Sequence, residues 1–289
     1  MCRWMAYSGD PILAHELLFK PKHSIIDQSL HADLGNGVTT NGDGFGIGWY
    51  GDRSGTSPTV FKSTHPAWND ENLREITTQI STPLLFAHVR ASSGTPVERS
   101  NCHPFRYGRW LWMHNGSLAG FPDVKRDLLM AVDPALYPMI QGSTDTEALF
   151  FLALTFGLSE DPPGAVARAV GFVEQVGHRH GVAYPVHMTV AASDGESIWI
   201  FRYSSEKATS SLYCSTDISQ VRSLYPELDV LNRLGSDTRF IVSEPLRELP
   251  GAWSEVPEGS WARIQASDYH LEPFVPIVKI VHSSRWHGS

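Results

Sequence analysis

The chain opens with MCRWMAYSGD, residues 1–10, and the interpretation of the whole sequence starts from its second residue, Cys2. Removal of the initiator methionine would leave a thiol and a free α-amine on one residue. An α-amine titrates at roughly pH 7.7–8.0, so part of it is neutral near pH 7 and can accept the thiol proton. Nucleophile and base then share one residue, as in enzymes with an N-terminal threonine. The alternative is a chance cysteine at the start of a strand.

Composition narrows the function classes. The chain has 289 residues with 42% hydrophobic and 11% aromatic side chains, enough for a sizeable core and too many for disorder. A net charge of −8 without a basic stripe argues against a nucleic-acid partner. The N-terminus lacks a signal peptide and no run of 18 apolar residues occurs, so we expect no membrane contact and a cytoplasmic location.

The 3 cysteines, Cys2, Cys102 and Cys214, show no CxxC spacing, which disfavours a disulfide framework and a structural zinc site. We expect neither a metal nor an organic cofactor. The glycines of the segment 42–48 lack the G-x-x-G step into a helix, so they predict a close-packed strand rather than a dinucleotide site. The segment His178-Arg179-His180 predicts a polar helix C-terminus rather than metal ligands.

Hydrophobic patterns predict strands on both sides of a helical middle region. The predicted strands are Phe45–Tyr50, Leu84–Val89, Trp110–Met113, Val186–Ala191, Ile198–Arg202, Phe240–Ser243 and Trp261–Ile264. The predicted helices are Asp123–Val132, Asp145–Leu158 and Ala165–Val176. This order favours layered sheets with helices segregated outside them over a doubly wound fold.

Four further segments carry polar residues suited to chemistry. Arg90 ends an apolar strand, where it could hold a carboxylate or pair with a surface acid. His103 follows in Asn101-Cys102-His103-Pro104. Asn115 and Gly116 could bind an oxyanion, although Asn-Gly after a strand also predicts a tight turn. Asp145 could bind an ammonium group or be an ordinary acid in the first turn of a helix.

The order of these segments is more specific than any one of them. Cys2, a strand arginine, Asn-x-His-Pro, His-Asn-Gly and Ser-x-Asp-x-Glu together resemble the class II glutamine amidotransferases. The resemblance is strongest to small stand-alone members, such as the γ-glutamyl hydrolase of ergothioneine biosynthesis. Those members also begin Met-Cys-Arg and carry segments similar to residues 41–50 and 240–246. The resemblance extends from Met1 to about residue 264.

The resemblance implies a fold and a set of roles. The fold is the four-layer αββα sandwich of N-terminal-nucleophile hydrolases, an α+β class, with Cys2 at the start of a central strand. Cys2 matches the nucleophile, and Asn115 with Gly116 matches the oxyanion hole. Arg90 matches the group that binds the substrate α-carboxylate and Asp145 the group that binds the α-amine.

The same resemblance gives His103 a supporting role near the site and divides the chain into a glutaminase domain, 1–264, and a C-terminal extension, 265–289, with a frayed tail. Arg3 and Ala91 stand where the synthases of the family have Gly and Trp, and the segment after Arg90 is shorter. These departures leave three functions open: hydrolysis of glutamine with ammonia passed to a separate synthetase, hydrolysis of a larger γ-glutamyl amide, or a catalytically idle binding protein.

Overall fold

Two antiparallel sheets form the centre of the molecule. The computed structural model describes residues 2–30, 41–51, 56–91, 95–225, 229–245 and 251–278. One sheet has seven strands in the order β11-β9-β10-β1-β4-β2-β3, and the other has six in the order β13-β12-β8-β7-β6-β5. The strands of the first are β1 (Arg3–Leu13), β2 (Phe45–Trp49), β3 (Thr59–Ser63), β4 (Ser81–Val89), β9 (Tyr213–Ser215), β10 (Arg239–Val242) and β11 (Trp253–Glu255). Those of the second are β5 (Phe105–Tyr107), β6 (Trp110–Leu118), β7 (Val186–Ser193), β8 (Ile198–Ser204), β12 (Ser260–Gln265) and β13 (Asp268–Pro273).

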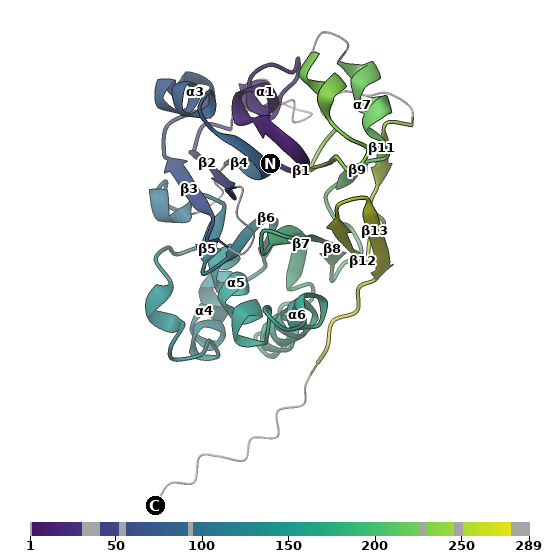
Figure 1. Ribbon diagram of the computed structural model, residues 1–289. Helices are drawn as coiled ribbons and strands as arrows, with labels where there is room; N and C mark the ends of the chain where they lie inside the picture. The colour runs from purple at the N-terminus through teal and green to yellow at the C-terminus, as the bar shows by residue number, and fades with distance from the viewer. Residues whose placement is uncertain are drawn as a thin grey trace, which may run out of the picture.

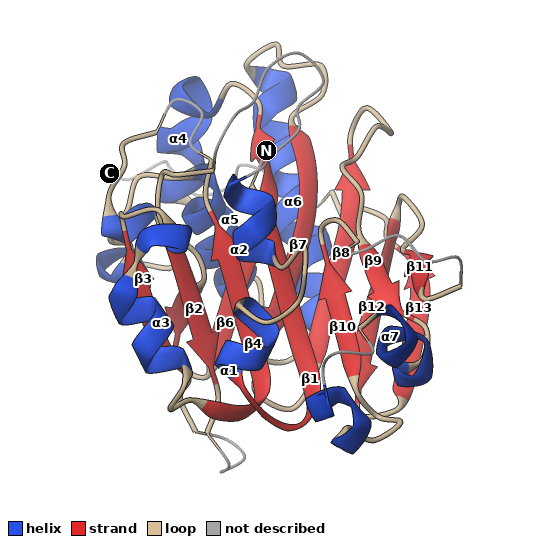
Figure 2. Cartoon of the chain, turned by 90° about the horizontal axis from the view of Figure 1, so that it is seen from above, coloured by secondary structure: helices blue, strands red, loops and turns tan. Residues whose placement is uncertain are grey.

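Helices cover the outer face of each sheet (Figures 1 and 2). The seven-stranded sheet is covered by α1 (Ala14–Leu18), α2 (Ile25–Leu30), α3 (Glu71–Thr77) and α7 (Ile218–Leu224). The six-stranded sheet is covered by α4 (Phe121–Met130), α5 (Asp145–Thr155) and α6 (Pro162–Arg179). Short 3-10 turns are η1 (Ala67–Asn69), η2 (Arg99–Asn101), η3 (Tyr137–Met139) and η4 (Asp229–Arg233). The predicted four-layer αββα sandwich is therefore confirmed.

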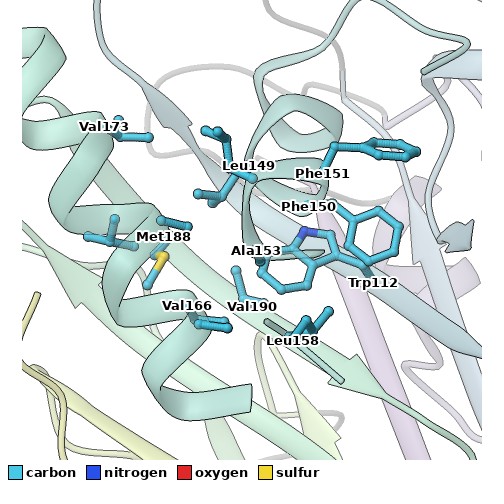
Figure 3. Packing of buried hydrophobic residues seen from close by; sticks show 14 of the residues in the cluster. Trp112, Leu149, Phe150, Phe151, Ala153, Leu158, Val166, Val173, Met188 and Val190 are labelled. Carbon is cyan, nitrogen blue, oxygen red and sulfur yellow. The ribbon is translucent and has the colours of Figure 1, made fainter. Parts of the chain in front are cut away.

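The molecule has three separate apolar layers, because successive side chains of a strand point to opposite faces of its sheet. On β1, Trp4 and Ala6 enter the core between the sheets, whereas Met5 and Tyr7 enter the core under α1 and α2. A third core lies between the six-stranded sheet and its helices, where Trp112 stacks on Phe150 at 5.5 Å between ring centroids (Figure 3). Each sheet thus has two buried faces.

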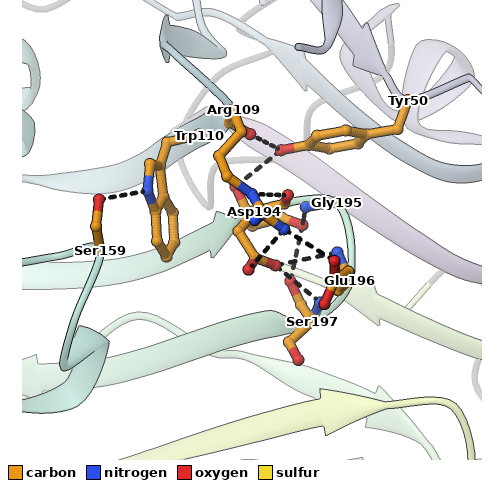
Figure 4. Close-up of polar contacts among 9 residues, drawn as sticks. Tyr50, Arg109, Trp110, Ser159, Asp194, Gly195, Glu196 and Ser197 are labelled. Atoms are coloured by element: carbon orange, nitrogen blue, oxygen red, sulfur yellow. Dashed lines mark hydrogen bonds and ion pairs between the residues drawn. The ribbon is translucent and has the colours of Figure 1, made fainter. Parts of the chain in front are cut away.

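Polar contacts fasten the two sheets together at the end where β6 begins (Figure 4). The hydroxyl of Tyr50, which follows β2, lies 2.8 Å from the carbonyls of both Arg109 and Ser193 and can donate to either. The Arg109 guanidinium donates to the carbonyl of Asp194 at 2.9 Å and pairs with Glu196 at 3.2 Å. The polar residues that the sequence singles out lie at the opposite end of β1, β4 and β6.

Most predicted elements are present with shifted ends. Cys2 directly precedes β1, which has three strands on each side in its sheet, and β7 pairs with β8 as an antiparallel hairpin. The Thr144 hydroxyl accepts the Glu147 N–H and caps the start of α5. Helix α6 ends at Arg179, which confirms the polar helix terminus.

One prediction is wrong. His114-Asn115-Gly116 is not a turn at the end of a strand, because β6 continues to Leu118 and pairs Asn115 with Thr189 and Gly116 with Met188 on β7. Pairing with a partner strand overrides the local preference of Asn-Gly for a turn.

Three predictions fall wholly or partly on residues that the structure does not describe: the removal of Met1, the shorter segment after Arg90, where 92–94 are not described, and the frayed tail at 283–289. The predicted domain boundary at 264–265 lies at the end of β12, which pairs with β13 in the same sheet; the division stays a prediction.

Candidate active site between the sheets

The alternation of three strands brings the predicted residues into one space between the sheets. On β4, Leu84 and Phe86 belong to the inter-sheet core, and His88 and Arg90 continue that parity. On β6, Leu111 and Met113 belong to the same core, and Asn115 follows them. Cys2 precedes Trp4 on the inner face of β1. We call Cys2, His88, Arg90 and Asn115 the inter-sheet cluster.

The Cys2 thiol is held by the backbone at the end of β4. It accepts the Ala91 N–H at 3.2 Å and lies 3.3 Å from the Ala91 carbonyl, to which it can donate. Burial raises the pKa of the Cys2 thiol, and the Ala91 hydrogen bond and the charges of Arg90 and Arg3 oppose only part of that rise. The resting thiol therefore keeps its proton near pH 7, and nucleophilic attack by sulfur requires a base.

Asn115 links the two sheets at Cys2. Its side-chain amide N–H donates to the Cys2 carbonyl at 2.8 Å, and its Oδ1 lies 3.1 Å from His88 Nε2. Because Oδ1 can only accept, Nε2 must carry the ring proton. Burial lowers the pKa of His88 to about 3, so the ring stays neutral near pH 7. The amide orientation is thus fixed by His88 and Cys2, and its second N–H remains to act on another oxygen.

Gly116 presents an exposed backbone next to Asn115. Its φ is +139°, and a Cβ at this position would lie 1.9 Å from the His187 carbonyl oxygen. Only glycine adopts this φ readily and has no Cβ that would displace β7. The Asn115 amide and the Gly116 backbone are adjacent on one strand, an arrangement in which two donors can serve one oxyanion.

Arg90 is buried and oriented by short bonds. Its guanidinium donates to the Thr95 hydroxyl at 2.5 Å and to the Asp43 carbonyl at 3.4 Å, and its backbone N–H donates to Gly44 at 2.8 Å. A guanidinium carries five N–H donors in a planar fork, a geometry that matches the two oxygens of a carboxylate. A buried, oriented arginine of this kind can bind a carboxylate at two points.

Asp145 stands apart from the cluster, at the first turn of α5. Its carboxylate accepts the Leu118 N–H at 2.7 Å and the Thr146 N–H at 2.8 Å, which ties α5 to the end of β6. His114 supports the same joint, with Nδ1 2.8 Å from the Thr146 hydroxyl. Asp145 therefore has a structural role in the resting protein, and each of its oxygens has a lone pair left for an ammonium group.

His103 packs behind the cluster. Its ring lies over the His88 ring at 4.1 Å between centroids and edge-on to Phe105 at 4.9 Å. Within the described ranges, neither ring nitrogen has a hydrogen-bond partner. Burial holds the pKa of His103 well below its usual value, so the ring is neutral. The contact with His88 places His103 one residue away from the Asn115 amide.

His88 and Arg3 make contacts at the cluster that the sequence did not lead us to expect. His88 lies two residues before Arg90 on a strand, and the two-residue period alone would have put both on one face. Arg3 donates to the Cys2 carbonyl at 3.5 Å and pairs with Glu244 at 2.8 Å, which ties the residue after Cys2 to the segment that follows β10. No local pattern marks the contact with Glu244.

The described residues contain no helix long and apolar enough to cross a membrane. In the same parts of the chain, no three His, Cys, Asp or Glu side chains are grouped so that they could hold a metal ion. The expected absence of metals and cofactors stays a prediction.

Comparisons with known proteins indicate one family for this chain. The profile of the glutamine amidotransferases class-II matches residues 24–271. The probable glutamine amidotransferase DUG3 of Saccharomyces cerevisiae is 33% identical over 95% of this chain and 85% of its own length. The γ-glutamyl-hercynylcysteine sulfoxide hydrolase of Mycolicibacterium smegmatis is 24% identical over 89% of this chain and 93% of its own.

One solved structure indicates the same family, and a second shares the fold. A glutamine aminotransferase class-II domain protein from Silicibacter pomeroyi superimposes with a TM-score of 0.72 at 31% identity, over 96% of this chain and 100% of that one. The glutamine phosphoribosylpyrophosphate amidotransferase of B. subtilis has a TM-score of 0.63 at 15% identity, covering 94% of this chain and 49% of that chain, which supports the fold alone. The chain belongs to the class II glutamine amidotransferases, enzymes that act on the γ-glutamyl C–N bond.

Proposed function

We propose that the protein hydrolyses the γ-amide of glutamine through a thioester on Cys2. The observation that supports the proposal is that two groups of Cys2 are held between the sheets, its thiol by the Ala91 backbone and its carbonyl by the oriented Asn115 amide. The Cys2 sulfur attacks the γ-carbonyl carbon, and the oxyanion that forms accepts hydrogen bonds from the second Asn115 N–H and the Gly116 backbone N–H.

The proton balance requires a free α-amine on Cys2. Because burial raises the thiol pKa, we propose that this amine, exposed by removal of Met1, takes the thiol proton as the S–C bond forms. The resulting ammonium then returns a proton to the leaving nitrogen as the C–N bond breaks, and ammonia departs. Water hydrolyses the thioester to glutamate and restores the thiol.

The glutamyl part of the substrate carries two charges that the site can bind. We assign the α-carboxylate to the Arg90 guanidinium and the α-ammonium to Asp145. His103 keeps a supporting role through its contact with His88. A site that binds both charged groups rejects analogues that lack either one more strongly than an apolar pocket can.

The leaving group is either ammonia or a larger amine, because a relative is named as the hydrolase of a larger γ-glutamyl compound. A protein that releases ammonia can pass it to a separate synthetase subunit, whereas a γ-glutamyl amide hydrolase releases an amine. An idle binding protein on this fold is the third candidate; the thiol and amide contacts at Cys2 favour an enzyme.

One experiment separates these functions. The purified protein is incubated with glutamine and with a panel of γ-glutamyl amides, and glutamate, ammonia and released amines are quantified. A glutamine-analogue diazo-ketone is then applied, and the labelled peptide is found by mass spectrometry. We expect turnover, an intact mass without Met1, and a label on Cys2. An active protein that retains Met1 would exclude the amine as base, and a label on Cys102 would exclude Cys2 as nucleophile.

A further inference from the structure

A cavity of about 390 Å³ opens where the edges of the two sheets meet. Strand β3 ends one sheet and β5 ends the other, and both lie on the same side of the molecule beside α5 (Figure 1). We call this the edge cavity. Its lining comes from β3, η2, β5, η3 and α5, and comprises Val60, Lys62, Arg99, Ser100, Phe105, Arg106, Met139, Gln141, Glu147 and Phe151. No residue of the inter-sheet cluster lines it, and neither does Asp145.

The lining carries more positive than negative charge. Lys62, Arg99 and Arg106 are cations, and Glu147 is the one carboxylate among the lining residues. Glu147 is already engaged, because its two oxygens accept the N–H groups of Gln141 at 3.0 Å and Gly142 at 2.7 Å. Among the residues that the structure describes, no carboxylate forms an ion pair with any of the three cations.

Lys62 is the most constrained of the three cations. Its ammonium lies 4.7 Å from the centroid of the Phe105 ring, and burial lowers its pKa to about 8. The groups whose charges act on it are Cys102, Glu147, Arg99 and Arg106. Burial outweighs the attraction of the Glu147 carboxylate, so the Lys62 ammonium carries a desolvation cost that an anion in the cavity would offset.

The other two cations are held in place by backbone bonds. Arg99 Nε donates to the Lys62 carbonyl at 3.3 Å, and Arg106 Nη1 donates to the Pro58 carbonyl at 3.0 Å. These bonds use one N–H of each guanidinium, so several donors remain on each side chain. Three cations on three separate elements surround a space whose volume lies within the range of small-molecule pockets.

We propose that the edge cavity binds a compact polyanion, with two or more carboxylate or phosphate groups, at a site separate from Cys2. The anionic groups pair with Lys62, Arg99 and Arg106, and the apolar part of the ligand lies against Phe105, Met139 and Phe151. The proposal does not depend on the reaction at Cys2, because it uses none of the residues assigned to that reaction.

The test is isothermal titration calorimetry with two probes at constant ionic strength. Tricarballylate presents three carboxylates, and pyrophosphate presents two phosphates. We expect saturable binding of one or both, and the stronger probe identifies the head group. Lys62→Gln and Arg99→Gln should each weaken that binding at least tenfold, since a hydrogen bond to a charged group contributes about 1.5–3 kcal/mol.

The matched control is Lys22→Gln, which removes the same charge from the exposed turn after α1, on the helix-covered side of the seven-stranded sheet and outside the cavity lining. It should leave affinity within twofold. Raising the pH from 7 to 9.5 should weaken binding of tricarballylate, whose own groups do not titrate there, because Lys62 loses its charge. The proposal is wrong if neither probe binds saturably, or if Lys22→Gln weakens binding as much as Lys62→Gln and Arg99→Gln do.

Discussion

The inter-sheet cluster and the edge cavity are built from the same two sheets but differ in what fills them. In the cluster, the Asn115 amide is oriented by Cys2 on one side and His88 on the other. In the edge cavity, Arg99 and Arg106 are held through backbone carbonyls and Lys62 lies over the Phe105 ring. None of these three cations forms an ion pair with a carboxylate among the described residues. The inter-sheet cluster is a site whose hydrogen-bond donors already have fixed directions. The edge cavity is a site whose positive charges can bind an anionic ligand.

This contrast suggests that the two sites respond differently to substitution. In the cluster, an altered side chain loses an orientation or a substrate contact that turnover needs, so we expect changes in kcat or KM. In the cavity, an altered side chain loses an attraction, so we expect changes in anion affinity alone. The predictions below test that division, beginning with the largest expected effect.

Asn115→Ala should lower kcat for glutamine by about 10²–10³, because an oxyanion donor acts when charge develops on the carbonyl oxygen. KM should change by less than threefold. Steady-state kinetics with glutamine as substrate measure both constants. A variant that raises KM and keeps kcat would show that Asn115 binds the ground state, and the oxyanion assignment would be wrong.

Arg90→Gln and Asp145→Asn should raise KM for glutamine by about ten- to a hundredfold with a smaller change in kcat. Charged hydrogen bonds to the amino-acid end exist in both ground and transition states, and each contributes about 1.5–3 kcal/mol. Asp145→Asn keeps an oxygen that can accept the Leu118 N–H, so the joint between α5 and β6 is preserved.

Glutaramic acid, which lacks the α-amine, separates the two roles of Asp145. It should be a poor substrate for the wild type and should lose little more in Asp145→Asn, because the ammonium contact is already absent. Equal losses with glutamine and glutaramic acid would mean that Asp145 serves only the N-terminus of α5.

The parts of this contrast that the sequence could predict are those with a local signal. Cys2, Arg90, Asn115 and Gly116 stand in short motifs, and the apolar runs around them alternate with the strand period. The continuation of β6 through Gly116 has no such signal, because it depends on pairing with Thr189 and Met188 on a strand about seventy residues later. The cations of the edge cavity are spread over β3, η2 and β5, and only the packing of the two sheet edges brings them together.

His103 should make the protein less stable in acid. Its pKa in the folded protein lies well below the ordinary value because the ring is buried, so below about pH 6.5 the unfolded chain binds a proton that the folded chain does not. Stability therefore falls as the pH falls through that range. His103→Phe keeps the aromatic contacts and removes this loss, which amounts to about 2 kcal/mol between pH 7 and 5.

Urea unfolding of the wild type and His103→Phe at both pH values measures the difference. Other carboxyl and imidazole groups contribute equally to the two proteins, so the comparison isolates His103. If both proteins lose the same free energy of unfolding between pH 7 and 5, the His103 ring is protonated in the folded state or exposed to solvent.

His88→Phe should lower kcat by about tenfold, because the Asn115 amide loses the donor that fixes its orientation. KM should stay within twofold, since His88 touches no assigned substrate group. His88→Gln supplies an amide N–H in place of the ring N–H and should recover part of kcat. Thermal unfolding checks that both variants are folded. If His88→Gln is no better than His88→Phe while both are folded, His88 fills space and does not position Asn115.

Lys62→Gln should leave kcat and KM for glutamine within twofold of the wild type, the smallest effect expected here. Lys62 lies in the edge cavity, and none of its contacts reaches Cys2, Arg90 or Asn115 among the described residues. The same variant should lose at least tenfold in affinity for tricarballylate or pyrophosphate, so one substitution separates the two sites. Assays of glutamine turnover in buffer free of polyanions, beside the calorimetric titration, make the comparison on one protein preparation. A fall in kcat of tenfold or more in a folded Lys62→Gln variant would show that the cavity belongs to the catalytic machinery, and the division drawn between the two regions would fail.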